Sequence, residues 1–193
     1  TVYIWRRKQQ QDPNLDKVPN LNCSIDWDDQ DPELEQLGRL VRESDVVLDA
    51  LLGTGVKGSL RGTSPKLLSH IQQALEADDT DKQRFLLQHV GKAPSKADAS
   101  SPSRPLVVAV DTPSGLDCDT GQIDEHALYA DLTVTFAYPK RGLLLFPGAN
   151  RIGELLVADI GTDPTLAAEI PLSVATPKEV GQMLPRRPLN ARR

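Results

Sequence analysis

Apolar residues fall in short runs along the chain, separated by polar stretches that contain proline and glycine. Runs of this kind, apolar at most positions, are typical of strands buried in a parallel sheet. The expected strands span residues 2–5, 23–25, 45–52, 105–111, 132–136 and 154–159. Glycines follow the third run at Gly53 and Gly55, and these end that strand.

Two stretches between the apolar runs repeat apolar residues at helical spacing. Asp31-Pro32-Glu33 and Ser64-Pro65-Lys66 each place a capping residue before a proline, which is typical of a helix start. The apolar positions that follow are Leu34, Leu37, Leu40 and Val41, and then Leu67, Leu68, Ile71 and Leu75. Strands alternating with helices predict a three-layer α/β/α Rossmann-like domain with a mostly parallel sheet covered on both faces.

The polar stretches predict loops. The residues from the first run to about Asn22 are expected to have little regular structure, and residues 76–104 are expected to form a surface insertion. Because Thr1 opens directly into an apolar run, we expect the start of this domain to lie upstream.

Composition narrows the function classes. The 193 residues carry a net charge of -5 with scattered lysines and arginines, which disfavours a nucleic-acid partner. No run approaches the roughly 18 apolar residues of a membrane span, and the opening residues lack the order of a secretory signal, so we expect a soluble, cytoplasmic protein without a membrane partner. Two cysteines and three histidines without ligand spacing disfavour a zinc site or a disulfide framework.

Candidate chemistry follows three of the predicted strands. Ligands of open α/β sheets bind beyond the carboxyl ends of the strands, so polar and glycine residues there predict one shared site. These residues are Asp49 with Gly53 and Gly55, Asp111 with Ser114 and Gly115, and Lys140 with Gly142.

Each of these loops permits a structural interpretation beside the functional one. The glycines of residues 53–58 either serve a tight turn or let backbone N–H groups approach phosphates, and neither the GxGxxG nor the P-loop pattern is complete. Asp111 either caps its turn or, with Ser114, supplies hard oxygen ligands to an alkali cation. Ser114 lies in no nucleophile elbow, which disfavours a serine hydrolase. Asp117 and Asp131 are expected to anchor a turn and a strand.

Four ordered motifs carry a specific resemblance. They span residues 49–55, 108–117, 130–143 and 148–161, and together they resemble the NAD(P)H-hydrate epimerase family. The resemblance covers roughly Thr1 to Asp163 and implies an isomerase that interconverts the R and S forms of hydrated NADH and NADPH. Residues 1–163 are then the epimerase domain.

The resemblance also implies roles for individual residues. Asp111 would contact the substrate and act as acid or base, and Asp49 and Ser114 would bind a potassium ion. The loop against the substrate's phosphates would comprise Gly53, Thr54, Gly55, Val56, Lys57, Gly58 and Ser59. Lys57 and Lys140 either reach phosphate or are simply solvated, and we leave both outside the core assignment.

Two further expectations concern the rest of the protein. Residues 164–193 are similar to a linker leading to the ADP-dependent dehydratase domain that follows the epimerase in many bifunctional repair enzymes. An Asn-Asn-Gly-Gly-Asp string, which the family has near its start, does not occur in these 193 residues, and this leaves a non-catalytic nucleotide-binding or interaction domain as the alternative. A homodimer, and a preference between NADHX and NADPHX, stay open.

Overall fold

The computed structural model describes residues 1–5, 14–76, 104–170, 172–175 and 177–185. The chain divides into two compact units, Thr1–Ile160 and Gly161–Arg193, so the first unit ends three residues short of the predicted domain boundary at 163. The first unit is an α/β structure with parallel sheets, which confirms the predicted fold class. No helix among the described residues is long and apolar enough to cross a membrane.

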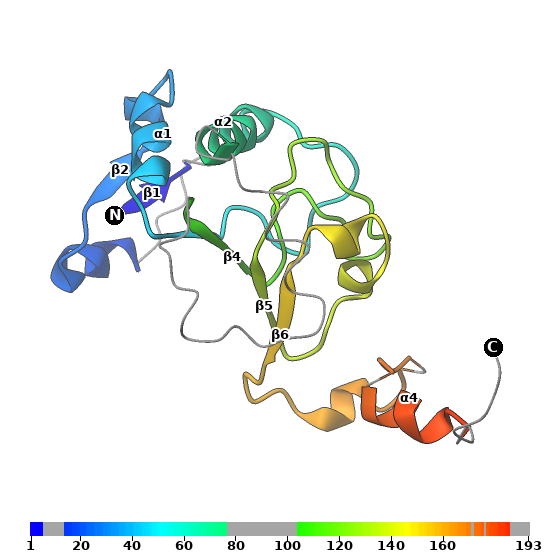
Figure 1. Ribbon diagram of the computed structural model, residues 1–193. Helices are drawn as coiled ribbons and strands as arrows, with labels where there is room; N and C mark the ends of the chain where they lie inside the picture. The colour runs from blue at the N-terminus through cyan, green and yellow to red at the C-terminus, as the bar shows by residue number, and fades with distance from the viewer. Residues whose placement is uncertain (6–13, 77–103, 171, 176, 186–193) are drawn as a thin grey trace, which may run out of the picture. The chain divides into compact units, whose positions relative to one another are not determined.

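The described strands form two sheets. β1 (Val2–Ile4) pairs with β2 (Ile25–Trp27), while β3 (Val46–Asp49), β4 (Leu106–Val110), β5 (Leu132–Phe136) and β6 (Glu154–Ala158) form a parallel sheet in that order. Figure 1 shows β4, β5 and β6 side by side. Since neighbouring strands run parallel, the chain leaves β3, β4 and β5 at the same edge of the sheet.

The predicted strand bounds need two corrections. The second strand was predicted at 23–25 but begins at Ile25, and the third was predicted to reach 52 but ends at Asp49. Asp49 pairs with Ala109 at the end of the β3–β4 ladder, and the apolar residues after it continue into the next loop. The stretch predicted as loop before Asn22 contains a 3-10 helix, η1 (Leu15–Leu21).

Asp31 stabilises the start of the first helix, although it lies outside that helix. α1 (Glu35–Arg42) has Leu34 at its N-cap with a left-handed φ of 60°, so Asp31 does not occupy the N-cap that its sequence position suggests. Its carboxylate still accepts hydrogen bonds from the amides of Gln36 (3.2 Å) and Leu37 (2.9 Å), which the helix itself leaves unpaired. The same carboxylate accepts the Tyr3 hydroxyl at 3.1 Å, which ties the helix start to β1.

Helices cover one face of the four-stranded sheet. α1 and α2 (Ser64–Glu76) bury Leu37, Val41, Leu67 and Leu75 against the inward side chains of the sheet. Those inward side chains are Val47, Val107 and Ala109. A second cluster on this face joins Leu155 of β6 to Leu143 of η3 (Arg141–Leu144).

The opposite face of the sheet is exposed among the described residues. Because side chains alternate along a strand, Leu48, Val46, Leu106 and Leu156 lie on this face, and Leu48 is 66% exposed. The sequence predicted a strand at 45–52 that was buried on both sides, and this is wrong for β3. The reason is that the described helices pack on the other face of this sheet.

Asp131 anchors the amino ends of two strands. Arg104 donates to both of its carboxylate oxygens, at 2.9 and 2.6 Å, and the amide of Val107 donates at 2.8 Å. This confirms the predicted anchoring role. The predicted surface insertion at 76–104 lies outside the described residues except at its two ends, Glu76 in α2 and Arg104 in this ion pair.

The described part of the second unit contains two short helical segments. η5 (Pro164–Ala167) is capped by the Asp163 carboxylate, which accepts the Thr165 amide at 2.9 Å. α4 (Pro177–Met183) follows. Most described side chains of this unit are exposed, including Leu166 at 75% and Met183 at 82%.

Replacing Leu67 with alanine tests the helix–sheet core. Leu67 is 3% exposed and packs in the cluster that joins α1, α2 and β4, so Leu67→Ala is expected to lower the free energy of unfolding by about 2–5 kcal/mol. Urea denaturation measures this. Leu21→Ala is the matched control, because Leu21 is 69% exposed and should change stability by less than about 0.5 kcal/mol. Equal losses in both variants would contradict the assigned core.

Candidate active site

Three loops meet beyond the carboxyl ends of β3, β4 and β5. The loop after β3 is joined to the loop after β4 by the Asp49–Ser114 contacts and by the Leu60 amide, which donates to Asp124 at 2.8 Å. The loop after β5 contacts the loop after β4 through two backbone hydrogen bonds. The Gly142 amide donates to the Cys118 carbonyl at 2.6 Å, and the Gly148 amide donates to the Gly121 carbonyl at 2.8 Å. The structure thus brings together the loops on which the sequence placed its candidate residues.

Asp49 and Ser114 form a buried pair. Asp49 Oδ2 accepts the Ser114 amide at 2.7 Å, and Oδ1 accepts the Ser114 hydroxyl at 2.5 Å. The hydroxyl oxygen in turn accepts the Leu52 amide at 2.9 Å. Asp49 is 4% exposed and Ser114 is fully buried. Burial raises the pKa of Asp49, and its hydrogen bonds with Ser114 and Leu51 oppose that rise without cancelling it.

Gly115 allows the turn that presents Ser114. Its φ of 95° lies in the region that favours glycine, and a Cβ there would stand 2.9 Å from the Cβ of Ala127. The turn is closed further on by Asp117, whose carboxylate accepts the amides of Asp119 (2.8 Å) and Thr120 (3.0 Å). Asp117 therefore anchors the turn, as predicted.

Asp111 begins the same turn in a strained conformation. Its φ is 70°, which is uncommon for a residue other than glycine and occurs often at functional sites. Oδ1 accepts the Phe136 amide (3.2 Å), the Thr135 hydroxyl (3.2 Å) and the Lys140 ammonium. The side chain is 21% exposed. Partial burial raises the pKa of Asp111, but the Lys140, Phe136 and Thr135 contacts outweigh it and lower the pKa overall.

The glycine loop after β3 is open to solvent. Gly53, Gly55 and Gly58 have no atom within 4 Å of where a Cβ would stand, and Gly58 has a left-handed φ of 66°. Lys57 lies 3.3 Å from Asp119, but both side chains are more than 70% exposed, so this pair holds the loop weakly. α2 begins only at Ser64. The phosphate-binding interpretation assumed that this loop leads directly into a helix, and the structure shows that it does not.

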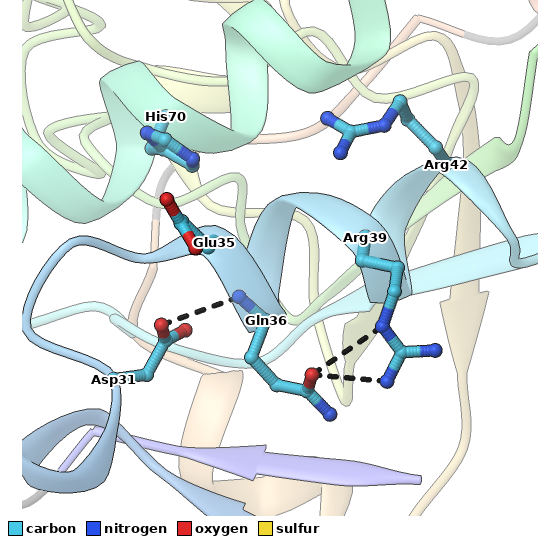
Figure 2. A pocket seen from close by; sticks show the side chains of 6 residues that line it. All are labelled: Asp31, Glu35, Gln36, Arg39, Arg42 and His70. Atoms are coloured by element: carbon cyan, nitrogen blue, oxygen red, sulfur yellow. Dashed lines mark hydrogen bonds between the residues drawn. The ribbon is translucent and has the colours of Figure 1, made fainter.

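A surface groove lies elsewhere, between α1 and α2. Figure 2 shows the six side chains that line it: Asp31, Glu35, Gln36, Arg39, Arg42 and His70. Gln36 accepts two hydrogen bonds from Arg39, and the Asp31 carboxylate accepts the Gln36 amide, so several of these groups are already paired. None belongs to the loops after β3, β4 or β5, so this groove is separate from the candidate site at the carboxyl ends of the strands.

Comparison with known proteins places the chain in a family. The family described as "YjeF-related protein N-terminus" matches residues 1–142. The chain belongs to this family. The match spans β1 to the start of η3, and so contains Asp49, Asp111, Ser114 and Lys140.

Relatives of this YjeF-related domain carry two kinds of name. The chain is 33% identical over 175 residues, 91% of its length, to 28% of the bifunctional NAD(P)H-hydrate repair enzyme Nnr of Thermofilum pendens. It is 32% identical over 62% of its length to 44% of the NAD(P)H-hydrate epimerase of Limosilactobacillus fermentum. It is also 53% identical over 55 residues to that of Weissella koreensis. The chain spans less than half the length of these relatives.

Sequence reasoning missed two partners of Asp111 in this YjeF-related domain. Lys140 was left outside the core assignment, and Thr135 was taken only as part of a strand. The alternation of β5 carried a usable signal, because Thr133 and Thr135 put hydroxyls on the covered face of the sheet and are both fully buried. Thr133 donates to the Ile152 carbonyl at 2.7 Å, whereas Thr135 contacts Asp111 and Lys140.

The turn after β4 can be tested through Gly115. Gly115→Ala places a side chain at a left-handed φ and against Ala127, so the free energy of unfolding should fall by about 1–3 kcal/mol. Guanidinium denaturation measures it. Gly55→Ala serves as the matched control, since its Cβ would meet no atom, and it should stay within about 0.5 kcal/mol of wild type. A Gly115→Ala protein as stable as the control would show that the turn relaxes freely.

Proposed function

We propose that this domain interconverts the R and S epimers of hydrated NADH and NADPH, as one part of a bifunctional repair protein. The main structural support is the position of Asp111, a partly exposed carboxylate in a strained backbone conformation where three loops meet. The family and the names of the relatives support the same reaction. The glycine loop, residues 53–59, is proposed to lie against the phosphates of the dinucleotide.

The chemistry of the substrate suits a single carboxylate. The reacting carbon bears a hydroxyl next to a ring nitrogen, so its configuration is lost either by reversible departure of water or by reversible ring opening. In ring opening, Asp111 accepts the hydroxyl proton, the carbon–nitrogen bond breaks to leave a carbonyl, and the nitrogen takes up a proton. Closure on the other face reverses each step. Because Lys140 favours the ionised carboxylate, Asp111 begins as a base on this route.

A potassium ion fits the Asp49–Ser114 pair by the chemistry of its donors. Both residues offer hard oxygen atoms, which alkali and alkaline-earth cations prefer. Among the described residues, no cationic side chain pairs with Asp49, although its carboxylate is 4% exposed. A bound potassium ion would supply the positive charge that stabilises the ionised form there. The two residues would be only part of the ligand set.

The wider context of the domain rests on its relatives. We propose that a dehydratase domain follows it and that residues 164–193 lead to that domain, and the bifunctional repair enzymes among the relatives support this proposal. The cytoplasmic location and the homodimer expected from the sequence stay predictions.

Asp111→Asn tests the proposed base. In the whole gene product this variant is expected to lower the rate of epimer interconversion by about 10²–10⁴-fold, because the amide cannot accept the proton. Chromatography of the two NADHX epimers over time measures the rate. Affinity for the dinucleotide should change little, since the loop at residues 53–59 is untouched.

The matched control is Asp45→Asn, which neutralises an exposed carboxylate just before β3, at the other end of the strand from Asp49. Its rate should equal that of wild type. Wild-type turnover by Asp111→Asn would refute the assignment. A wild-type protein that binds the dinucleotide but never interconverts the epimers would favour the non-catalytic binding domain.

Potassium binding can be tested without an activity assay. A ligand that binds only the folded state stabilises it by about 2.7 kcal/mol at a hundredfold excess over Kd. We therefore expect potassium chloride to raise the Tm of the wild type above its value in choline chloride of equal ionic strength. Asp49→Asn should lose this difference and Asp45→Asn should keep it. An equal potassium response in all three proteins would place the ion elsewhere.

A further inference from the structure

The ammonium of Lys140 is fully occupied by the protein. Its Nζ donates to Asp111 Oδ1, to the Thr135 hydroxyl at 2.9 Å and to the Phe136 carbonyl at 3.0 Å. An ammonium has three N–H groups, so these partners use all of them. Lys140 is 22% exposed, unlike Lys57 at 74%. This geometry leaves no donor for a phosphate, which was one of the two roles considered for Lys140 from the sequence.

The backbone around Lys140 is held on both sides. Before it, Ala137 has a left-handed φ of 62° and the Tyr138 amide donates to the Phe136 carbonyl at 2.7 Å, which turns the chain sharply after β5. After it, Gly142 packs on the loop that follows Asp111, where a Cβ would stand 2.2 Å from the Asp117 carbonyl oxygen. The backbone of Lys140 is therefore fixed in the position from which its side chain contacts Asp111.

The two carboxylate oxygens of Asp111 differ in their hydrogen bonds. Oδ1 accepts three hydrogen bonds, from Lys140, Thr135 and Phe136. Among the residues that the structure describes, Oδ2 accepts none. When one carboxylate oxygen is held in place, the position and orientation of the other are fixed as well. Proton-transfer rates depend on placing the reacting atoms to within a fraction of an ångström.

We propose that Lys140 is the positioning residue of the reaction, which fixes Oδ1 of Asp111 so that Oδ2 is the oxygen that takes the substrate's hydroxyl proton. This inference rests on the proposed epimerase function. Lys140 itself touches no substrate and moves no proton. Its fixed positive charge also keeps Asp111 ionised, so the carboxylate starts each cycle ready to accept a proton.

Lys140→Met is the first variant, because it keeps an unbranched apolar stem and removes the charge and the donors. In the whole gene product, kcat for NADHX at neutral pH should fall roughly 10–100-fold while KM changes less than about threefold. The acid limb of the kcat–pH profile should move to higher pH, since Asp111 loses the group that favours its ionised form. Lys140→Arg keeps the charge and should recover most of the profile.

Lys66→Met is the matched control, because Lys66 is exposed and its partner among the described residues is the Pro32 carbonyl, at 2.8 Å. It should leave kcat and the pH profile unchanged. A Lys140→Met protein with wild-type kcat and an unshifted acid limb would overturn the positioning role. A loss of kcat with an unshifted acid limb would overturn it too, because structural damage alone would explain that result.

A second measurement separates this inference from the proposed function. The carboxyl ¹³C resonance of Asp111, assigned by its loss in Asp111→Asn, reports the titration of this group without turnover. It should titrate at higher pH in Lys140→Met than in wild type. If Lys140→Met does not fold, Lys140→Gln, which is neutral but keeps amide donors, takes its place. An inactive wild-type protein would refute the proposed epimerase function. Separately, an Asp111 titration that is the same in Lys140→Met and wild type would refute the coupling between Lys140 and Asp111.

Discussion

The bonds from Asp49 to the amide and hydroxyl of Ser114 join the end of β3 to the turn after β4, and the rest of the site depends on them. They fix Ser114 beneath the loop that follows β3, where its hydroxyl also accepts the Leu52 amide. Gly115 makes this turn possible, since another residue would strain the backbone and strike Ala127. With the turn fixed at Ser114, Asp111 at its other end is placed against β5 and the loop beyond it.

The two carboxylates at this edge of the sheet have opposite environments. Asp49 is buried without a cationic side chain among the described residues, and burial raises its pKa. Asp111 is partly exposed beside an ammonium, and its pKa is lowered. Groups whose environments push their pKa values apart are suited to different roles. A carboxylate with a raised pKa gains most from a bound cation, whereas one with a lowered pKa is ready to accept a proton.

Much of the fold follows from local pattern, and the contacts that complete the site do not. The strands that became β4, β5 and β6 were predictable because their apolar runs are bounded by polar turns, and the positions of Asp49 and Asp111 at strand ends followed directly. The partner of Lys140 was not predictable, because it lies 29 residues away and depends on the sharp turn at Ala137. The split into two sheets and the exposed face of β3 depend on tertiary packing, which periodicity does not report.

The last residues of β3 reverse the usual relation between polarity and burial. Leu48 is 66% exposed, whereas its neighbour Asp49 is 4% exposed. The register explains this, because Asp49 pairs with Ala109 and so points to the face that α1 and α2 cover, while Leu48 pairs with Val108 on the other face. A shift of one residue would bury Leu48 and expose Asp49. Keeping a carboxylate on the covered face costs free energy, which Ser114 offsets only in part. This cost supports the proposal that Asp49 belongs to a cation site.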